Sequence, residues 1–179
     1  MVLRITSGTY KNRVLASIPG KGFRPLSERM KLALFSAIGD KIHGVRFLDL
    51  FAGTGNVGLE ALSRGAASVT FVEQYRDKID LIKRNTDFIG KPEEITIIQS
   101  DVLSFHTEEE YDIIFAGPPY KANIGTEILS HLRDSKIMSS GVVLILQRHY
   151  RERPDTAGYT GIRSSRYGIT CLDFLKLDS

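Results

Sequence analysis

The chain has 179 residues, 42% of them hydrophobic and 25% charged, with a formal net charge of +3. This composition is that of an ordinary globular protein and excludes a fibrous or largely disordered chain. No apolar run approaches the roughly 20 residues that a membrane helix requires, and the opening MVLRITSGTYKNR lacks the apolar centre of a secretory signal peptide. We therefore expect one domain over residues 1–179, located in the cytoplasm and away from membranes.

The N-terminal segment, residues 1–31, is expected to form a small basic appendage of short strands and turns. It carries seven Lys or Arg against one acid, and residues 148–166 carry five Arg against two acids. Basic charge at the two ends favours a polyanionic partner such as nucleic acid, because each neutralised phosphate releases counterions. A solvated basic surface with no partner explains the same pattern equally well.

From residue 26 onward, segments of helical period alternate with apolar runs rich in Val, Ile and Phe. The apolar runs predict strands at 45–50, 68–73, 95–98, 112–116, 141–147 and 168–175, with a shorter one at 160–165. The periodic segments predict helices at 26–39, 56–64, 75–89 and 124–133. This alternation indicates an α/β fold with a mostly parallel sheet. The side chains of the last run alternate in polarity, so we expect an antiparallel hairpin at the sheet edge.

A glycine-rich turn links the first predicted strand of this sheet to the following helix. The sequence Gly53-Thr54-Gly55-Asn56-Val57-Gly58 fits the G-x-G-x-x-G pattern in the strand-to-helix context that nucleotide binding requires. Glu73 ends the next strand, where a carboxylate can accept hydrogen bonds from ribose hydroxyls, and Asp101 follows the strand after that. A plain strand-to-helix connection would explain the glycines alone, but the acids at successive strand ends predict an adenosine cofactor.

The identity of that cofactor is decided by Asp49, four residues before Gly53. A carboxylate at this strand tip would repel the pyrophosphate of a dinucleotide, whereas it could bind the ammonium group of a methionine moiety. We therefore predict S-adenosylmethionine and keep an NAD-dependent oxidoreductase as the alternative. The predicted cofactor-binding residues are Asp49, Phe51, Gly53, Thr54, Gly55, Glu73, Gln74, Asp101 and Val102.

A second motif, Gly117-Pro118-Pro119-Tyr120, follows the strand at 112–116. It resembles the Asp/Asn-Pro-Pro-Tyr motif of class I S-adenosylmethionine-dependent methyltransferases that act on exocyclic amines. The segments 49–66 and 111–120, together with RITSGTYKNRVL, RPLSERMKLALF and YGITCLDF, are similar to the RsmD family, which methylates the N2 amine of a guanine in small-subunit ribosomal RNA.

This resemblance implies a Rossmann-like three-layer sandwich with a mostly parallel seven-stranded sheet and an antiparallel last strand. It implies S-adenosylmethionine as the methyl donor and ribosomal RNA as the partner, within an assembled or partly assembled small subunit. We expect the protein to act as a monomer. The predicted RNA-binding residues are Arg4, Lys11, Arg24 and Arg29.

The chemistry of the second motif can be argued from its residues, Gly117, Pro118, Pro119 and Tyr120, which are the predicted catalytic set. An exocyclic amine is a poor nucleophile, so methyl transfer depends on holding its nitrogen in line with the methyl group. Backbone carbonyls of the stiff loop can accept hydrogen bonds from the amine, and Tyr120 can stack on a base taken out of its helix.

Two positions depart from the family pattern. Gly117 stands where the family has Asp, and Gln147 stands where an acid is expected. The chain can therefore also be a catalytically weak or inactive relative that binds cofactor and RNA. The four His residues share no spacing of metal ligands, so no metal site is expected. The single Cys171 is expected to be a buried strand thiol.

Overall fold

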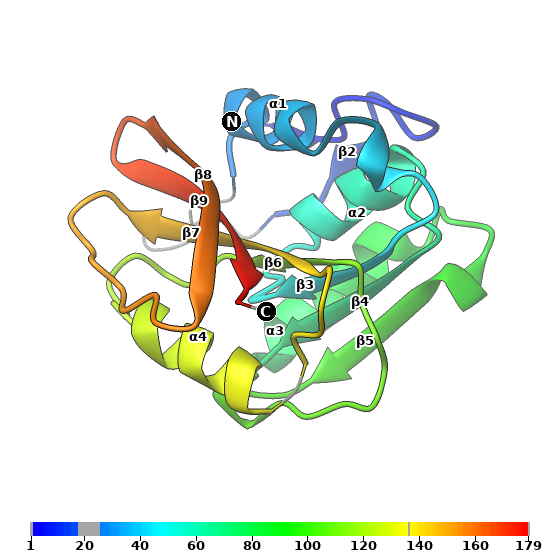
Figure 1. Ribbon diagram of the computed structural model, residues 1–179. Coiled ribbons are helices and arrows are strands. Elements are labelled where there is room, and N and C mark those ends of the chain that lie inside the picture. The colour runs from blue at the N-terminus through cyan, green and yellow to red at the C-terminus, as the bar shows by residue number, and fades with distance from the viewer. Residues whose placement is uncertain (1, 18–25, 136, 179) are drawn as a thin grey trace.

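The computed structural model describes residues 2–17, 26–135 and 137–178. Within these residues, seven strands form one sheet in the order β5-β4-β3-β6-β7-β9-β8 (Figure 1). Their bounds are β3 Arg46–Leu50, β4 Ser68–Glu73, β5 Ile95–Gln99, β6 Ile113–Ala116, β7 Val143–His149, β8 Tyr159–Tyr167 and β9 Thr170–Leu177. The strands from β5 to β7 pair in parallel, and β9 pairs antiparallel with both β7 and β8. The predicted mostly parallel sheet with an antiparallel last strand is confirmed.

The hairpin of β8 and β9 differs in detail from the prediction. The strand expected at 160–165 is longer and forms the sheet edge, and β9 lies between it and β7. Most of the β8 side chains are exposed, so an apolar pattern could not mark its full length. Gly168, with φ of 62°, lies in the turn between the two strands.

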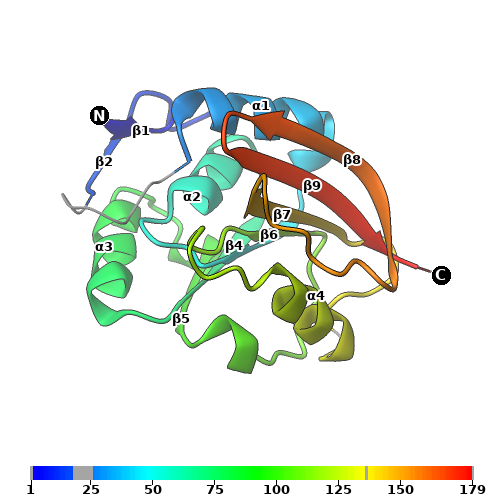
Figure 2. The ribbon, with the colours of Figure 1, turned by 90° about the vertical axis from the view of Figure 1, so that its left-hand side faces the viewer.

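Helices cover both faces of the sheet. The helices α1 Glu28–Ile38, α2 Asn56–Ser63 and α3 Arg76–Thr86 pack on one face, and α4 Gly125–Asp134 packs on the other with the short 3-10 helix η3, Val102–Ser104. Figure 2 shows α1 and α2 above the sheet and α4 below it. The four predicted helices are present, and the ends of α1 and α3 lie inside the predicted ranges. Two further 3-10 helices are η1 Gly39–Ile42 and η2 Pro92–Glu94.

Each face has its own apolar core. Phe47, Phe71 and Phe115 point into the layer of α1 to α3, whereas Ile114 and Leu146 point towards α4. The two sets alternate along the strands, as the pleat of a sheet requires. No helix in the described ranges combines the length and the apolar character that a bilayer crossing demands.

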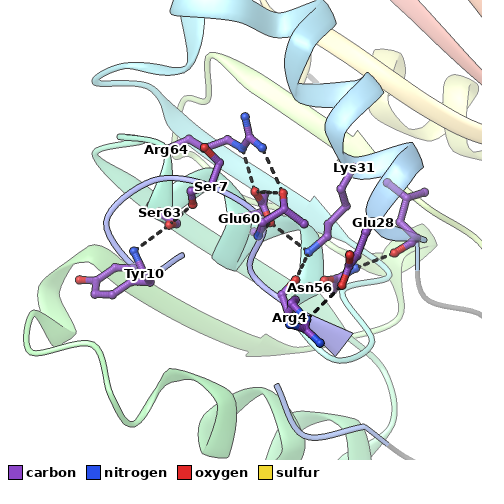
Figure 3. A network of polar contacts seen from close by, with 12 residues as sticks. Arg4, Ser7, Tyr10, Glu28, Lys31, Asn56, Glu60, Ser63 and Arg64 are labelled. Carbon is purple, nitrogen blue, oxygen red and sulfur yellow. Dashed lines mark hydrogen bonds and ion pairs between the residues drawn. The ribbon is translucent and has the colours of Figure 1, made fainter. Parts of the chain in front are cut away.

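The N-terminal segment is joined to α2 by buried polar contacts. The strands β1 Leu3–Arg4 and β2 Val14–Leu15 form an antiparallel pair. Lys31 is fully buried, and its Nζ donates to the Arg4 carbonyl at 2.6 Å and to Glu60 Oε2 at 3.0 Å. Thr6 and Arg64 also donate to the Glu60 carboxylate, and Figure 3 shows Lys31 and Arg64 reaching it from two sides. Part of the basic charge of residues 1–31 is therefore bound inside the protein.

Candidate active site

The glycine turn between β3 and α2 has the backbone conformation that its glycines permit. The φ angles of Phe51, Gly53 and Gly55 are 60°, 60° and 75°, and Gly55 is the N-cap of α2. A Cβ on Gly58, inside the helix, would lie 2.7 Å from Val69 Cγ1 and would overlap the Phe71 ring. The first two glycines thus form the sharp turn, and the third lets α2 lie close to β4.

Asp49 lies beneath this turn, almost completely buried at 1% exposure. Its Oδ2 accepts a hydrogen bond of 2.8 Å from the Gly58 N–H, near the start of α2. The pKa of the Asp49 carboxyl is raised to about 8, chiefly by burial and to a smaller extent by the charge of Glu73, while the Gly58 hydrogen bond acts in the opposite direction. A cation that approached this carboxyl would stabilise its ionised form.

Glu73, at the end of β4, holds the glycine turn in place. Its Oε2 accepts from the Gly53 N–H at 2.9 Å, and its Oε1 accepts from the N–H groups of Gln74 and Tyr75 at 2.9 and 3.1 Å. The Nζ of Lys78 lies 3.6 Å from Oε1. Since a carboxylate offers about four acceptor positions, Oε2 retains one for a ligand. The predicted ribose acid therefore also has a structural role that its position in the sequence did not reveal.

The remaining predicted cofactor residues follow the ends of β4 and β5. Asp101 is exposed, and its Oδ1 accepts from the Leu103 N–H at 2.8 Å, which caps η3. Val102 is buried in the core beneath α4, and Gln74 is exposed. Tyr75 follows β4 and is 55% exposed, and Leu103 follows β5 and is 37% exposed. They offer apolar surface that a purine ring can cover, and the sequence patterns did not single them out.

Two polar atoms in the glycine turn have no partner among the described residues. They are the hydroxyl of Thr54, a residue only 1% exposed, and Oδ1 of Asn56, whose Nδ2 donates to the Leu26 carbonyl at 3.1 Å. A buried polar atom without a hydrogen bond is costly. These atoms fit a site in which a bound ligand or an ordered water completes the hydrogen bonding.

The loop after β6 lies directly beside the glycine turn. The Gly117 N–H donates to the Leu50 carbonyl at the end of β3, at 3.3 Å. Pro118 is buried, Pro119 is exposed, and the carbonyl of Pro119 accepts from the Ala122 N–H at 2.9 Å. The structure therefore brings the two predicted motifs, which are about sixty residues apart in sequence, to neighbouring strand ends.

Tyr120 is fixed by two polar side chains from β7 and β9. Its hydroxyl is hydrogen-bonded to the Thr170 hydroxyl and accepts from Gln147 Nε2 at 3.2 Å. The Oε1 of Gln147 lies 3.6 Å from the place where a Cβ on residue 117 would stand. Sequence reasoning noted Gln147 only as a departure from a family, and its contacts with Tyr120 and Gly117 arise from sheet pairing.

Aromatic and basic side chains extend this site along the ends of β7 and β8. The His149 ring lies between those of Tyr120 and Tyr150, with centroid distances of 6.2 and 4.7 Å. The guanidinium carbons of Arg166 and Arg151 lie 4.0 and 5.4 Å from the Tyr150 ring centroid. We name this group, with the exposed Arg153, the Tyr150 cluster: His149, Tyr150, Arg151, Arg153 and Arg166. The charge count pointed to this segment, but not to its position beside Tyr120.

The predicted RNA-binding residues of the N-terminal segment are in different environments. Arg4 forms an ion pair of 3.3 Å with Glu28, whereas Lys11 and Arg29 are exposed. Arg24 lies outside the described residues. Across the described part of the chain, no three His, Cys, Asp or Glu side chains gather where they could hold a metal ion.

Comparisons with known proteins identify relatives over most of the chain. A family model described as "Conserved hypothetical protein 95" matches residues 3–176. The putative rRNA methyltransferase YlbH of Bacillus subtilis is 31% identical, over 97% of this chain and 98% of that protein. The ribosomal RNA small subunit methyltransferase D of Escherichia coli is 29% identical, over 81% and 74%. Among solved structures, the putative methyltransferase yhhF of Escherichia coli aligns with a TM-score of 0.85 at 25% identity, over 100% and 99%.

Proposed function

The chain belongs to the family described as conserved hypothetical protein 95, the RsmD family that its sequence resembles, and its structure has the Rossmann-like fold expected of that family. From this premise we propose that the protein is an S-adenosylmethionine-dependent methyltransferase acting on the N2 amine of a guanine in small-subunit ribosomal RNA. The observation that carries the proposal is the contact between the two motifs. The Gly117 N–H bonds the Leu50 carbonyl, so a cofactor on the glycine turn would lie beside a base held by the Gly117–Tyr120 loop.

The residues around the glycine turn fit this cofactor. Thr54 and Asn56 present buried polar atoms that lack partners, Asp49 is a buried carboxyl suited to an ammonium group, and Glu73 retains an acceptor position for a ribose hydroxyl. When bound, S-adenosylmethionine supplies an electrophilic methyl group on its sulfonium sulfur. The protein holds this methyl group at the carboxyl ends of the strands and selects S-adenosylmethionine over other adenosine cofactors. Asp49 disfavours the NAD alternative, because an ammonium group would stabilise the ionised form of this buried acid whereas a pyrophosphate would not.

The loop after β6 supplies the binding site for the target base. The carbonyls of Gly117 and Pro118 can accept hydrogen bonds from the exocyclic amine, which orients its lone pair. The Tyr120 ring, fixed at its hydroxyl by Gln147 and Thr170, offers a rigid stacking surface for a base taken out of its helix. Holding both reactants in line accounts for most of the rate that such a site can provide.

RNA binding is assigned to two groups of basic residues, one that adjoins Tyr120 and one on the N-terminal segment. The Tyr150 cluster extends from Tyr120, and its arginines form no ion pair with a described acid. Lys11 and Arg29 are exposed on the N-terminal segment and remain predicted RNA contacts, as does Arg24. The substrate we propose is RNA within an assembled or partly assembled small subunit, bound by a cytoplasmic monomer that forms a single domain.

Ligand-dependent stability tests the cofactor assignment. A ligand at a hundred times its dissociation constant adds about 2.7 kcal/mol to the free energy of unfolding. We expect S-adenosylhomocysteine to raise the melting temperature and NAD to leave it unchanged. A larger shift with NAD would establish the oxidoreductase alternative. Binding of S-adenosylhomocysteine and of subunits without methyl transfer would establish the inactive relative.

A further inference from the structure

We propose that the side-chain oxygen of Gln147, which faces Gly117, accepts a hydrogen bond from the target amine. This inference rests on the proposed methyltransferase function and assigns one further group that contacts the substrate. It concerns the one position of the Gly117–Tyr120 loop at which the chain has no side chain.

Sheet pairing places Gln147 next to Gly117. Ala116 of β6 is paired with Leu146 of β7, so the next residues, Gly117 and Gln147, are neighbours at the carboxyl ends of two parallel strands. Phe115 and Ile145, two residues earlier, point into the layer of α1 to α3, and Gln147 points to the same face because side chains alternate. A Cβ on residue 117 would stand 3.6 Å from Gln147 Oε1. The Phe115 ring closes one side of that position, with Cε1 2.9 Å from the same point, and the amide oxygen of Gln147 faces Gly117 from another.

In the structure the amide of Gln147 has its nitrogen towards Tyr120 and its oxygen towards Gly117. Nε2 donates to the Tyr120 hydroxyl at 3.2 Å, and that hydroxyl is bonded in turn to Thr170 on β9. Oε1 receives no hydrogen bond from any described residue, although Gln147 is only 7% exposed. The oxygen is not among the fully buried atoms without a partner, so a donor can reach it, and polar atoms of such a largely buried side chain are usually hydrogen-bonded. An exocyclic amine stacked against Tyr120 would supply such a donor.

The chemistry of transfer needs such an acceptor but no base at this position. One N–H of the amine donates to Gln147 Oε1, in place of the Gly117 carbonyl, and the other to the Pro118 carbonyl, so the nitrogen lone pair is directed at the methyl group. The new C–N bond forms from that lone pair, the C–S bond breaks with its electrons remaining on sulfur, and the surplus proton on nitrogen passes to water. A neutral amide does not take up this proton, so Gln147 positions the amine and stabilises the charge that develops on it.

Three variants separate this role from a structural one. Gln147→Ala removes the oxygen and also the donor to Tyr120. Thr170→Val removes only the other hydrogen bond of Tyr120, and it is the matched control for a role through the tyrosine. Gln147→Glu keeps an oxygen beside Gly117, but that oxygen now belongs to a carboxyl group, which can ionise. Single-turnover methyl transfer to undermodified small subunits is measured for each, with the affinity for S-adenosylhomocysteine measured by calorimetry.

We expect Gln147→Ala to lower the single-turnover rate constant by about a hundredfold, which is the usual loss for one preorganised hydrogen-bonding group. Thr170→Val should lose far less, and all variants should bind S-adenosylhomocysteine as the wild type does. Gln147→Glu should restore most of the rate and introduce a dependence on pH near the pKa of a carboxyl group, which a merely structural residue would not produce.

The outcomes distinguish the inference from the function on which it rests. Equal rates for wild type and Gln147→Ala would overturn the role of Gln147 while leaving the methyltransferase function intact. An equal loss in Thr170→Val and Gln147→Ala would assign the effect to Tyr120 and would also overturn the inference. A wild-type protein that binds S-adenosylhomocysteine but transfers no methyl group would overturn the proposed function, and the inference with it.

Discussion

The Glu73 carboxylate accepts a hydrogen bond of 2.9 Å from the Gly53 N–H, so the acid at the end of β4 holds the first glycine of the turn after β3. The same carboxylate accepts from the N–H groups of Gln74 and Tyr75. One side chain thereby sets the shape of the turn and the path of the chain that follows β4. The shape of the turn and the proposed ribose contact therefore depend on the same side chain.

Glu73→Ala should therefore lower both stability and cofactor affinity. Loss of the acceptor leaves the buried Gly53 N–H unpaired, which costs about 1–3 kcal/mol of unfolding free energy, and it removes the predicted ribose contact. Glu73→Gln retains one oxygen and should be intermediate in stability. Urea unfolding and calorimetry with S-adenosylhomocysteine measure the two effects. Unchanged stability in Glu73→Ala would show that the carboxylate does not hold the turn.

The pKa of Asp49 makes a prediction about pH. Burial raises it to about 8, whereas an unfolded Asp ionises near pH 4, so between these values the folded protein keeps a proton that the unfolded chain gives up. The stabilising contribution is complete below about pH 4 and is lost as the pH rises to about 8. In the variant Asp49→Asn the side chain cannot ionise, but its oxygen can still accept the hydrogen bond from the Gly58 N–H.

Asp49→Asn should consequently gain stability relative to the wild type as the pH rises towards 8, and it should lose affinity for S-adenosylhomocysteine because the ammonium partner is gone. Urea unfolding over this pH range measures the first effect. Parallel stability profiles for the two proteins would show that Asp49 is already ionised near pH 4.

Gly117→Asp tests whether the site has adapted to a glycine. A Cβ at this position would lie 2.9 Å from Cε1 of the buried Phe115, and the new carboxylate would face the oxygen of Gln147. We expect the single substitution to destabilise the protein by about 1–3 kcal/mol, as overpacked side chains usually do. Combined with Gln147→Ala it should transfer methyl faster than Gln147→Ala alone, because the carboxylate then accepts from the amine. A double variant no faster than Gln147→Ala would contradict this.

The Tyr150 cluster predicts a salt-dependent contact with RNA. Arg166 lies over Tyr150, whereas the exposed Arg163 on the same strand contacts Ser165 instead. Arg166→Ala should reduce by about one the slope of log affinity for ribosomal particles against log salt, the change expected for one lost phosphate contact. Arg163→Ala is the matched control. If both slopes equal that of the wild type, Arg166 contacts no phosphate.

The features that the sequence predicts correctly are those formed by residues close together in the chain. The glycine turn, the strands around it and the loop after β6 each follow from patterns within about ten residues, and alternation of helices and strands is enough to indicate a parallel sheet. The antiparallel ending followed from the alternating pattern and from the family resemblance.

The contacts that sequence reasoning missed join residues far apart. Lys31 was counted as part of a basic surface, but it is buried against Glu60, and Tyr120 was expected to stack without its partners Gln147 and Thr170. These pairs are 29, 27 and 50 residues apart, and only the packing of α1 on α2 and the pairing of β7 with β9 bring them together. Charge and spacing alone do not determine such contacts.

Methyl transfer to ribosomal RNA is the direct test of the proposed function. Undermodified small subunits are incubated with labelled S-adenosylmethionine and the protein, and the RNA is digested to nucleosides for mass spectrometry. We expect label in N2-methylguanosine from the wild type and about a hundredfold slower labelling by Gln147→Ala. Label in another nucleoside, or none from a protein that binds S-adenosylhomocysteine, would contradict it.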